Sequence, residues 1–199
     1  MKTLVLGSTS PFRKAILEKL RLPFICAKPD IDESARKNES ASSLVERLAT
    51  EKAQAVADEY PNALIIGSDQ VALCNEEIIG KPHNYENAVK QLLSFSGKSV
   101  VFYTGLCVFD SKKKITSSIV DTFTVHFQDL SLKDISNYLQ AEQPYNCAGS
   151  FKSEGLGICL FSRLEGDDPN TLIGLPLIKL VSLLKTQGLD VLSEQTPTE

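Results

Sequence analysis

The stretch that decides the fold is Leu64-Ile65-Ile66-Gly67-Ser68-Asp69-Gln70-Val71-Ala72-Leu73. A continuous apolar run of this length is typical of a strand that is buried on both faces. Asp69 lies in the middle of the run, where a carboxylate is costly unless a cation, hydrogen bonds or a catalytic task compensates for its lost hydration. Hydrogen bonds from nearby backbone amides alone would also explain a buried aspartate. The rest of the chain favours a catalytic acid or base.

The N-terminal residues predict a strand over residues 3–6, rather than a signal peptide, and then an anion-binding turn. Ser10 is a typical helix N-cap, and Pro11 is a typical first helical residue. Ser8 adds a second hydroxyl to the turn, and Arg13 stands in the first helical turn, where a cation opposes the helix dipole. A bound anion would satisfy the free N–H groups, the dipole and the arginine together. The alternative is a plain cap with a solvated cation.

Four further charged residues stand out by their positions. They are Glu33 in a polar turn, Lys52 near the edge of an apolar helical stripe, Lys81 at the end of a hairpin and Lys152 in a small polar loop. Cations beside two carboxylates suit a polyphosphate bound with a divalent metal. The cations would neutralise phosphate oxygens, and a carboxylate would bind the metal or accept a proton from water. A solvated turn at Glu33 and a Lys52 that extends to solvent are the plainer alternatives.

The order of elements predicts one α/β domain. A long helix is expected from about Ser43, with Ser43 and Glu46 at capping-box spacing, and a late strand over residues 157–161. Strands that alternate with helices, interrupted by two hairpins, indicate a mixed sheet flanked by helices. We expect this single domain to cover residues 1–192, followed by a flexible tail over residues 193–199.

Composition excludes several classes of protein. The net charge is −4, so a basic face for DNA or RNA is not expected, and no apolar run approaches the roughly 20 residues that cross a bilayer. Five scattered cysteines and two histidines predict neither a disulfide framework nor a zinc site, but reduced thiols in a cytoplasmic protein. Cys147 is a weak candidate for a catalytic thiol, because such a thiol needs a nearby base.

The motifs occur together in an order that resembles the Maf family over nearly the whole chain. They are Ser8-Thr9-Ser10-Pro11-Phe12-Arg13, Asp32-Glu33, Glu51-Lys52-Ala53, Gly67-Ser68-Asp69-Gln70, Gly80-Lys81-Pro82, Tyr103-Thr104-Gly105, Ala148-Gly149-Ser150-Phe151 and Gly174-Leu175-Pro176. The resemblance implies an elongated, twisted mixed sheet in two lobes with a cleft, related to the inosine triphosphatase fold. It also implies hydrolysis of a nucleoside triphosphate between its α- and β-phosphates, with a divalent metal such as magnesium, manganese or cobalt.

Carried over to this sequence, the resemblance makes Asp69 the proton acceptor that activates water and places Glu33 with it near the metal. Arg13, Lys52 and Lys81 would hold phosphates. The residues themselves add Ser8, Ser10 and Lys152 as candidate phosphate ligands.

Phe12, Gln70 and Glu154 depart from the commoner Maf pattern, which has arginine, threonine and glutamine at these positions. They resemble the 7-methyl-GTP pyrophosphatase branch, where these positions govern substrate choice. The base of 7-methyl-GTP carries a positive charge, which an aromatic face attracts by about 0.5–2 kcal/mol. A carboxylate at Glu154 can accept hydrogen bonds from guanine while offsetting that charge. Phe12 as a packing residue and a Glu154–Lys152 ion pair are the alternatives.

Two other functions stay open beside 7-methyl-GTP hydrolysis in the house-cleaning of modified nucleotides. One is a dTTP/UTP pyrophosphatase, and the other is a nucleotide-binding regulator of cell division without turnover. We expect no membrane or nucleic-acid partner, and a homodimer is left open.

Overall fold

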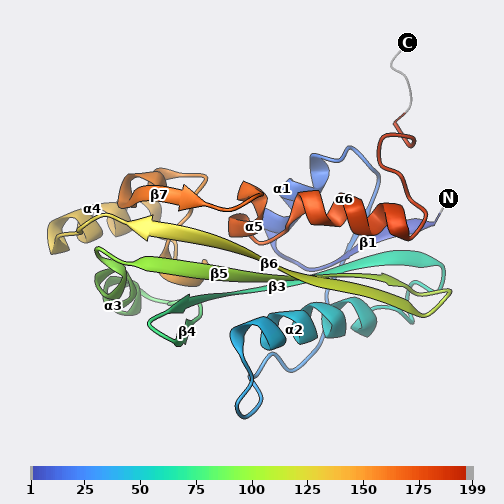
Figure 1. Ribbon diagram of the computed structural model, residues 1–199, viewed down its shortest axis with the longest axis horizontal. Coiled ribbons are helices and arrows are strands. Elements are labelled where there is room, and N and C mark those ends of the chain that lie inside the picture. Colours follow the sequence, from blue (N-terminus) through green and yellow to red (C-terminus); the bar gives the residue numbers. More distant parts are fainter. Residues whose placement is uncertain (1, 196–199) are drawn as a thin grey trace. The chain divides into compact units, whose positions relative to one another are not determined.

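The computed structural model describes residues 2–195 and contains one mixed β-sheet with helices (Figure 1). The strands are β1 (Thr3–Gly7), β2 (Ile25–Ala27), β3 (Ala63–Cys74), β4 (Glu77–Ile79), β5 (Ser99–Asp110), β6 (Ile115–Phe127) and β7 (Phe161–Glu165). The helices are α1 (Pro11–Glu18), α2 (Ala41–Ala55), α3 (Tyr85–Phe95), α4 (Leu132–Glu142), α5 (Pro169–Ile173) and α6 (Leu177–Thr186), with short 3-10 helices η1 (Ala148–Ser150) and η2 (Leu156–Leu160).

The sheet has seven strands in the order β2-β1-β3-β5-β6-β7, with β4 paired to β3. β1 runs parallel to both β2 and β3, whereas β4 is antiparallel to β3 and β7 is antiparallel to β6. The predicted α/β class and mixed sheet are therefore confirmed. Within the described residues, no helix combines the length and apolarity that crossing a membrane requires.

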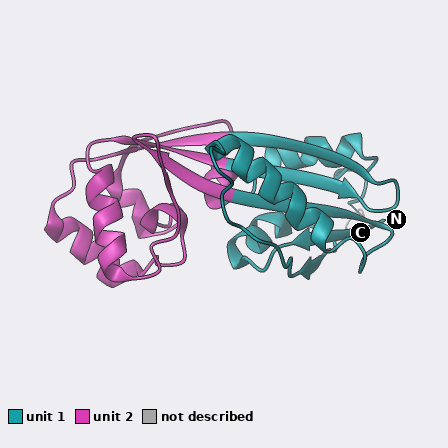
Figure 2. Ribbon diagram, turned by 90° about the horizontal axis from the view of Figure 1, so that it is seen from below, with its two compact units in different colours: residues 1–69, 104–121, 174–199 teal, residues 70–103, 122–173 magenta. Residues whose placement is uncertain are grey.

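The chain divides into two compact units (Figure 2). Unit 1 consists of residues 1–69, 104–121 and 174–199, and unit 2 of residues 70–103 and 122–173. By these boundaries β3, β5 and β6 each contribute to both units. The expected single domain over 1–192 stays a prediction, and residues 196–199 of the expected flexible tail lie outside the described residues.

Each unit has its own apolar core. In unit 1, the small apolar face of α2 packs with strand residues such as Val5, Ile65 and Cys107. In unit 2, phenylalanines make edge-to-face contacts, among them Phe151 with Phe161 at a centroid distance of 4.9 Å. Such ring pairs contribute beyond the area they bury.

Glycines bring α2 unusually close to the sheet of unit 1. A Cβ at Gly67 would lie 2.0 Å from the carbonyl oxygen of Ala49, and one at Gly105 would lie 2.0 Å from that of Val45. At Gly7 the nearest atom would be the carbonyl oxygen of Lys52, at 3.0 Å. The glycines on β1, β3 and β5 therefore admit the helix backbone where any side chain would exclude it.

The predicted helix start at Ser10 and Pro11 agrees with the structure, but two other local predictions are wrong. Ser40, not Ser43, caps α2, and its hydroxyl accepts a hydrogen bond from the backbone N–H of Ser43. The expected strand over 157–161 is instead η2, because a Cβ at Gly157 would lie 2.3 Å from the carbonyl oxygen of Lys152 in a tight turn. Strand pairing with β6 begins only at Phe161.

Candidate functional site

The centre of the candidate site in unit 1 is the Lys52 side chain. It projects from α2, and its Nζ lies 2.6 Å from Oδ1 of Asp69 and 3.0 Å from Oε1 of Glu33. The Lys52 and Asp69 side chains are only 7% and 11% exposed, whereas Glu33 is 61% exposed. Lys52 thus extends inward rather than to solvent, and it joins the two carboxylates that the sequence proposed as partners.

Asp69 is compensated by a cation and not by backbone amides. Lys52 engages Oδ1, and no residue between 2 and 195 hydrogen-bonds Oδ2. The paired charges of the carboxylate and the ammonium offset much of each other's lost hydration. One oxygen of a fixed carboxylate is therefore available to a ligand or a water molecule.

Arg13, which follows the turn before α1, lies close enough to Asp69 and Glu33 for their charges to act on it. Ser10 caps the helix, Pro11 is its first residue, and the Ser8 hydroxyl accepts a hydrogen bond from the backbone N–H of Ser10. Burial lowers the pKa of the Arg13 guanidinium, and the charges of Asp69 and Glu33 act in the opposite direction. The guanidinium remains charged because its ordinary pKa is far above neutrality. This turn therefore brings two hydroxyls and a cation together at a helix N-terminus, where an anion can bind.

The carbonyl of Gly174 holds the Arg13 side chain in place. It accepts a hydrogen bond from Arg13 Nε at 2.8 Å, and the Ser68 hydroxyl lies 2.9 Å from the same oxygen. Gly174 has a φ of 112°, a conformation that side chains disfavour. In the sequence, Gly174 stands out only within the family pattern, and no local signal indicates this contact, which joins residues 161 positions apart.

Two candidates in unit 2, Gln70 and Lys81, differ in how they are held. The Gln70 amide donates hydrogen bonds to the carbonyl oxygens of Thr171 and Leu172 at 2.8 and 3.1 Å, and so anchors α5. Lys81 is exposed and forms no ion pair within the described part of the chain. An exposed ammonium without a carboxylate partner is available to a phosphate.

Lys152, also in unit 2, is held by Glu142 and not by Glu154. Its Nζ donates to the side chain and to the carbonyl oxygen of Glu142, both at 3.1 Å. The alternative of a Lys152–Glu154 ion pair is not found, and Glu154 is exposed next to Ser153. Cys147 is a poor nucleophile, because burial raises its thiol pKa to about 11.

Phe12 is half-buried on α1, directly before Arg13 in the sequence. The structure therefore neither exposes the ring fully nor places it in the core. A face of the ring that remains accessible can stack on a base.

The carboxylates of Glu33 and Asp69 suit a hard cation. Magnesium is usually bound by one or two carboxylates together with substrate phosphates rather than by a closed protein cage. No group of three or more potential ligands among histidine, cysteine, aspartate and glutamate occurs in residues 2–195. Glu33 and Asp69 are the side chains in unit 1 that would hold the cation.

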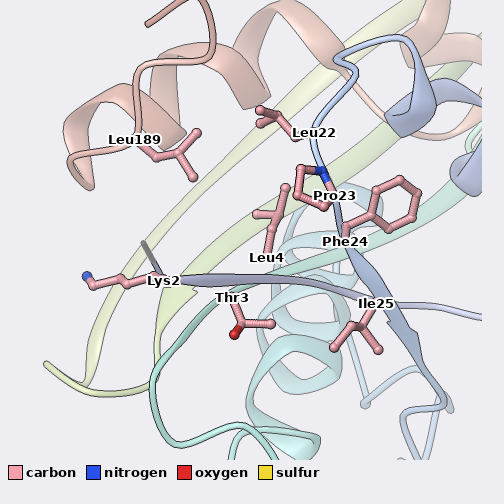
Figure 3. A pocket seen from close by; sticks show the side chains of 8 residues that line it. All are labelled: Lys2, Thr3, Leu4, Leu22, Pro23, Phe24, Ile25 and Leu189. Carbon is pink, nitrogen blue, oxygen red and sulfur yellow. The ribbon is translucent and has the colours of Figure 1, made fainter. Parts of the chain in front are cut away.

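An apolar pocket of about 330 Å³ lies elsewhere in unit 1 (Figure 3). It is lined by Leu4, Leu22, Pro23, Phe24, Ile25 and Leu189, with Lys2 and Thr3. None of the candidate site residues lines it, so it is separate from the charged cluster.

The sequence pattern of the family described as "Maf-like protein" matches residues 3–187. The chain belongs to the Maf family. This Maf protein is 76% identical to a protein named 7-methyl-GTP pyrophosphatase from Colwellia psychrerythraea, over 98% of each chain. A protein of the same name from Vibrio cholerae is 57% identical over 95% of this chain and 97% of its own.

Among solved structures, the Ham1 protein of Staphylococcus aureus is similar to this Maf chain with a TM-score of 0.47. The two are 14% identical, and the match covers 64% of this chain and 73% of Ham1.

Proposed function

We propose that this protein hydrolyses 7-methyl-GTP to 7-methyl-GMP and pyrophosphate in the cytoplasm. The observation that carries the proposal is the buried Lys52, whose ammonium lies between the carboxylates of Asp69 and Glu33 beside the Arg13 turn. The names of the relatives support the choice of substrate.

In this mechanism Asp69 is the general base. It accepts a proton from water as the water oxygen bonds to the α-phosphorus. The bond between the α-phosphorus and the bridging oxygen breaks, and pyrophosphate leaves with that oxygen. Proton transfer to a positioned carboxylate contributes roughly 100- to 10,000-fold to a rate. Lys52 holds the carboxylate in its orientation through the 2.6 Å contact.

The cations act on the phosphates. Arg13, with the Ser8 and Ser10 turn, would bind phosphate oxygens, and Lys81 and Lys152 are proposed for the same task. Fixed cations stabilise the charge that moves to the leaving oxygen in the transition state. A divalent metal (magnesium, manganese or cobalt) held by Glu33 and Asp69 would supply further charge neutralisation.

Substrate choice is proposed to depend on Phe12, Gln70 and Glu154. The Phe12 ring would stack on the cationic base, and Glu154 would accept hydrogen bonds from guanine. Gln70 would act through the α5 carbonyls that it holds.

The test is pyrophosphate release from 7-methyl-GTP, GTP, dTTP and UTP, each with magnesium, manganese or cobalt. The proposal predicts that 7-methyl-GTP is the fastest substrate. A preference for dTTP or UTP would move the protein to that branch of the family. Nucleotide binding without any release of pyrophosphate would instead indicate a regulator.

A further inference from the structure

The polar segment of residues 29–39, which carries Glu33, has neither helix nor strand. Most of its side chains are exposed, yet the Glu33 carboxylate lies 3.0 Å from the buried Lys52 ammonium. A segment of this kind samples many conformations unless other contacts fix it. Something must therefore hold Glu33 at Lys52.

The contact that does so comes from Arg47 on α2. Its Nε and Nη2 donate to the two carboxylate oxygens of Glu39 at 2.7 and 2.8 Å, a bidentate pair. Nη2 also donates to the carbonyl oxygen of Ser34 at 3.0 Å, directly after Glu33, and Nη1 donates to Glu51 at 2.9 Å. The Arg47 side chain is only 13% exposed, so all three nitrogens of the guanidinium are engaged in a largely buried position.

The arrangement links the segment to the helix that carries Lys52. Arg47 and Lys52 are five positions apart on the same helix, so α2 fixes the distance between the anchor and the ammonium. Arg47 binds the segment at two points, the carbonyl oxygen of Ser34 and the carboxylate of Glu39. Only a guanidinium can do this, because a lysine ammonium lacks the planar fork that matches a carboxylate.

The Glu39 carboxylate in turn orders the segment internally. It accepts a hydrogen bond from the backbone N–H of Arg36 at 2.8 Å, and the N–H of Glu39 donates to the carbonyl oxygen of Arg36. Hydrogen bonds from the Arg47 side chain and the Arg36 backbone lower the pKa of Glu39 to about 2. The anchor is thus ionised throughout the neutral range.

We infer that Arg47 is a positioning residue that holds residues 29–39 on α2, so that Glu33 meets Lys52. This inference rests on the proposed role of Glu33, and it adds a residue that is neither among the proposed substrate ligands nor in the family motifs quoted above. Loss of Arg47 should act on turnover only through Glu33.

The first test measures hydrogen–deuterium exchange of the backbone in Arg47→Met. Exchange of residues 34–39 should rise roughly tenfold, as expected for the loss of charge-assisted hydrogen bonds. Arg36→Met is the matched control, because it also removes a cation from this segment. The Arg36 side chain is 67% exposed, and its guanidinium forms an ion pair with Glu51 at 3.1 Å. Unchanged exchange in Arg47→Met, or an equal rise in Arg36→Met, would overturn the inference.

The second test is a double-mutant cycle on pyrophosphate release. Arg47→Met should lower kcat roughly tenfold in the wild-type background, but by no more than about twofold in Glu33→Gln, because the two changes remove one function. Losses that multiply would show a general structural effect and contradict the inference. If Arg47→Met does not fold, the same measurements are made on Glu39→Gln, which removes the bidentate carboxylate partner of Arg47. If the wild-type protein releases no pyrophosphate, the proposed function fails, while the exchange comparison still decides whether Arg47 holds the segment.

Discussion

At the scale of single residues, Lys52 carries both stability and chemistry. Its ammonium compensates the buried Asp69 carboxylate and also reaches Glu33. Removal of one partner of a buried pair leaves the other charge uncompensated. Lys52 therefore cannot be lost without a cost to the fold, whatever its part in turnover.

Replacement of Lys52 by methionine tests this stability role. Lys52→Met should lower the free energy of unfolding by about 3 kcal/mol, because Asp69 stays buried without its cation. Urea unfolding measures the change. Lys14→Met is the matched control, because Lys14 forms only a long, exposed ion pair, with 3.9 Å between its Nζ and Oε1 of Glu18. This substitution should change the free energy of unfolding by less than about 0.5 kcal/mol. Equal effects of the two variants would contradict the role assigned to Lys52.

Phe12 tests the proposed recognition of a cationic base. Phe12→Arg should lower kcat/KM for 7-methyl-GTP roughly tenfold or more relative to UTP, because it replaces an attractive ring by a like charge. The ratio of the two kcat/KM values is the measurement. Phe12→Tyr keeps an aromatic face and should retain the ratio. A ratio unchanged in Phe12→Arg would leave Phe12 as a packing residue.

At the scale of elements, the close contact between α2 and the sheet sets where Lys52 lies. Gly67→Ala should destabilise the protein by about 1–3 kcal/mol, since the new Cβ meets helix backbone that cannot rotate away. Gly80→Ala is a matched control, because a Cβ at Gly80 meets nothing within 4 Å. Thermal unfolding of both variants is the measurement. A Gly67→Ala variant as stable as Gly80→Ala would show that α2 is not held as described.

Glu39, in the segment of residues 29–39, should make the free energy of unfolding depend on pH. The pKa of Glu39 is lowered from 4.5 to about 2 in the folded state, so its contribution is complete above pH 4.5 and is lost as the pH falls towards 2. The difference in unfolding free energy between wild type and Glu39→Gln should follow this course in urea titrations at several pH values. A difference that persists unchanged at pH 2 would contradict the assignment.

Local sequence signals predicted elements well where the partners are near in the chain. Ser10 caps α1 and Pro11 is its first residue, as expected. The predicted start of α2 was wrong because Ser40 and Ser43 both have a side chain that can cap a helix. The structure shows that Ser40 is the cap, since its hydroxyl accepts a hydrogen bond from the backbone N–H of Ser43.

The candidate site was predictable in its residue types but not in its contacts. The pairing of Lys52 with Asp69 and Glu33 needs the fold, because these residues come from a helix, a strand and a loop. Arg47 was missed although its spacing to Glu51 is a recognised helical pair, since nothing in the sequence connects it to Glu39 or Ser34. The Glu142 partner of Lys152 was missed for the same reason.

At the scale of the whole molecule, the Maf chain consists of two units through which three long strands run. The charged cluster of Lys52, Asp69, Glu33 and Arg13 belongs to unit 1, whereas Gln70, Lys81, Lys152 and Glu154 belong to unit 2. The cleft expected between the two lobes stays a prediction, as do the roles of these residues in substrate binding.

The most direct test of the account is pyrophosphate release from 7-methyl-GTP by wild type, Asp69→Asn and Asp58→Asn. The asparagine retains an oxygen that can accept from Lys52, so the fold should persist while the base is lost. Asp69→Asn should therefore lose activity roughly 100-fold or more, and the exposed Asp58→Asn should keep it. Full activity in a folded Asp69→Asn protein would contradict the central claim that Asp69 activates water.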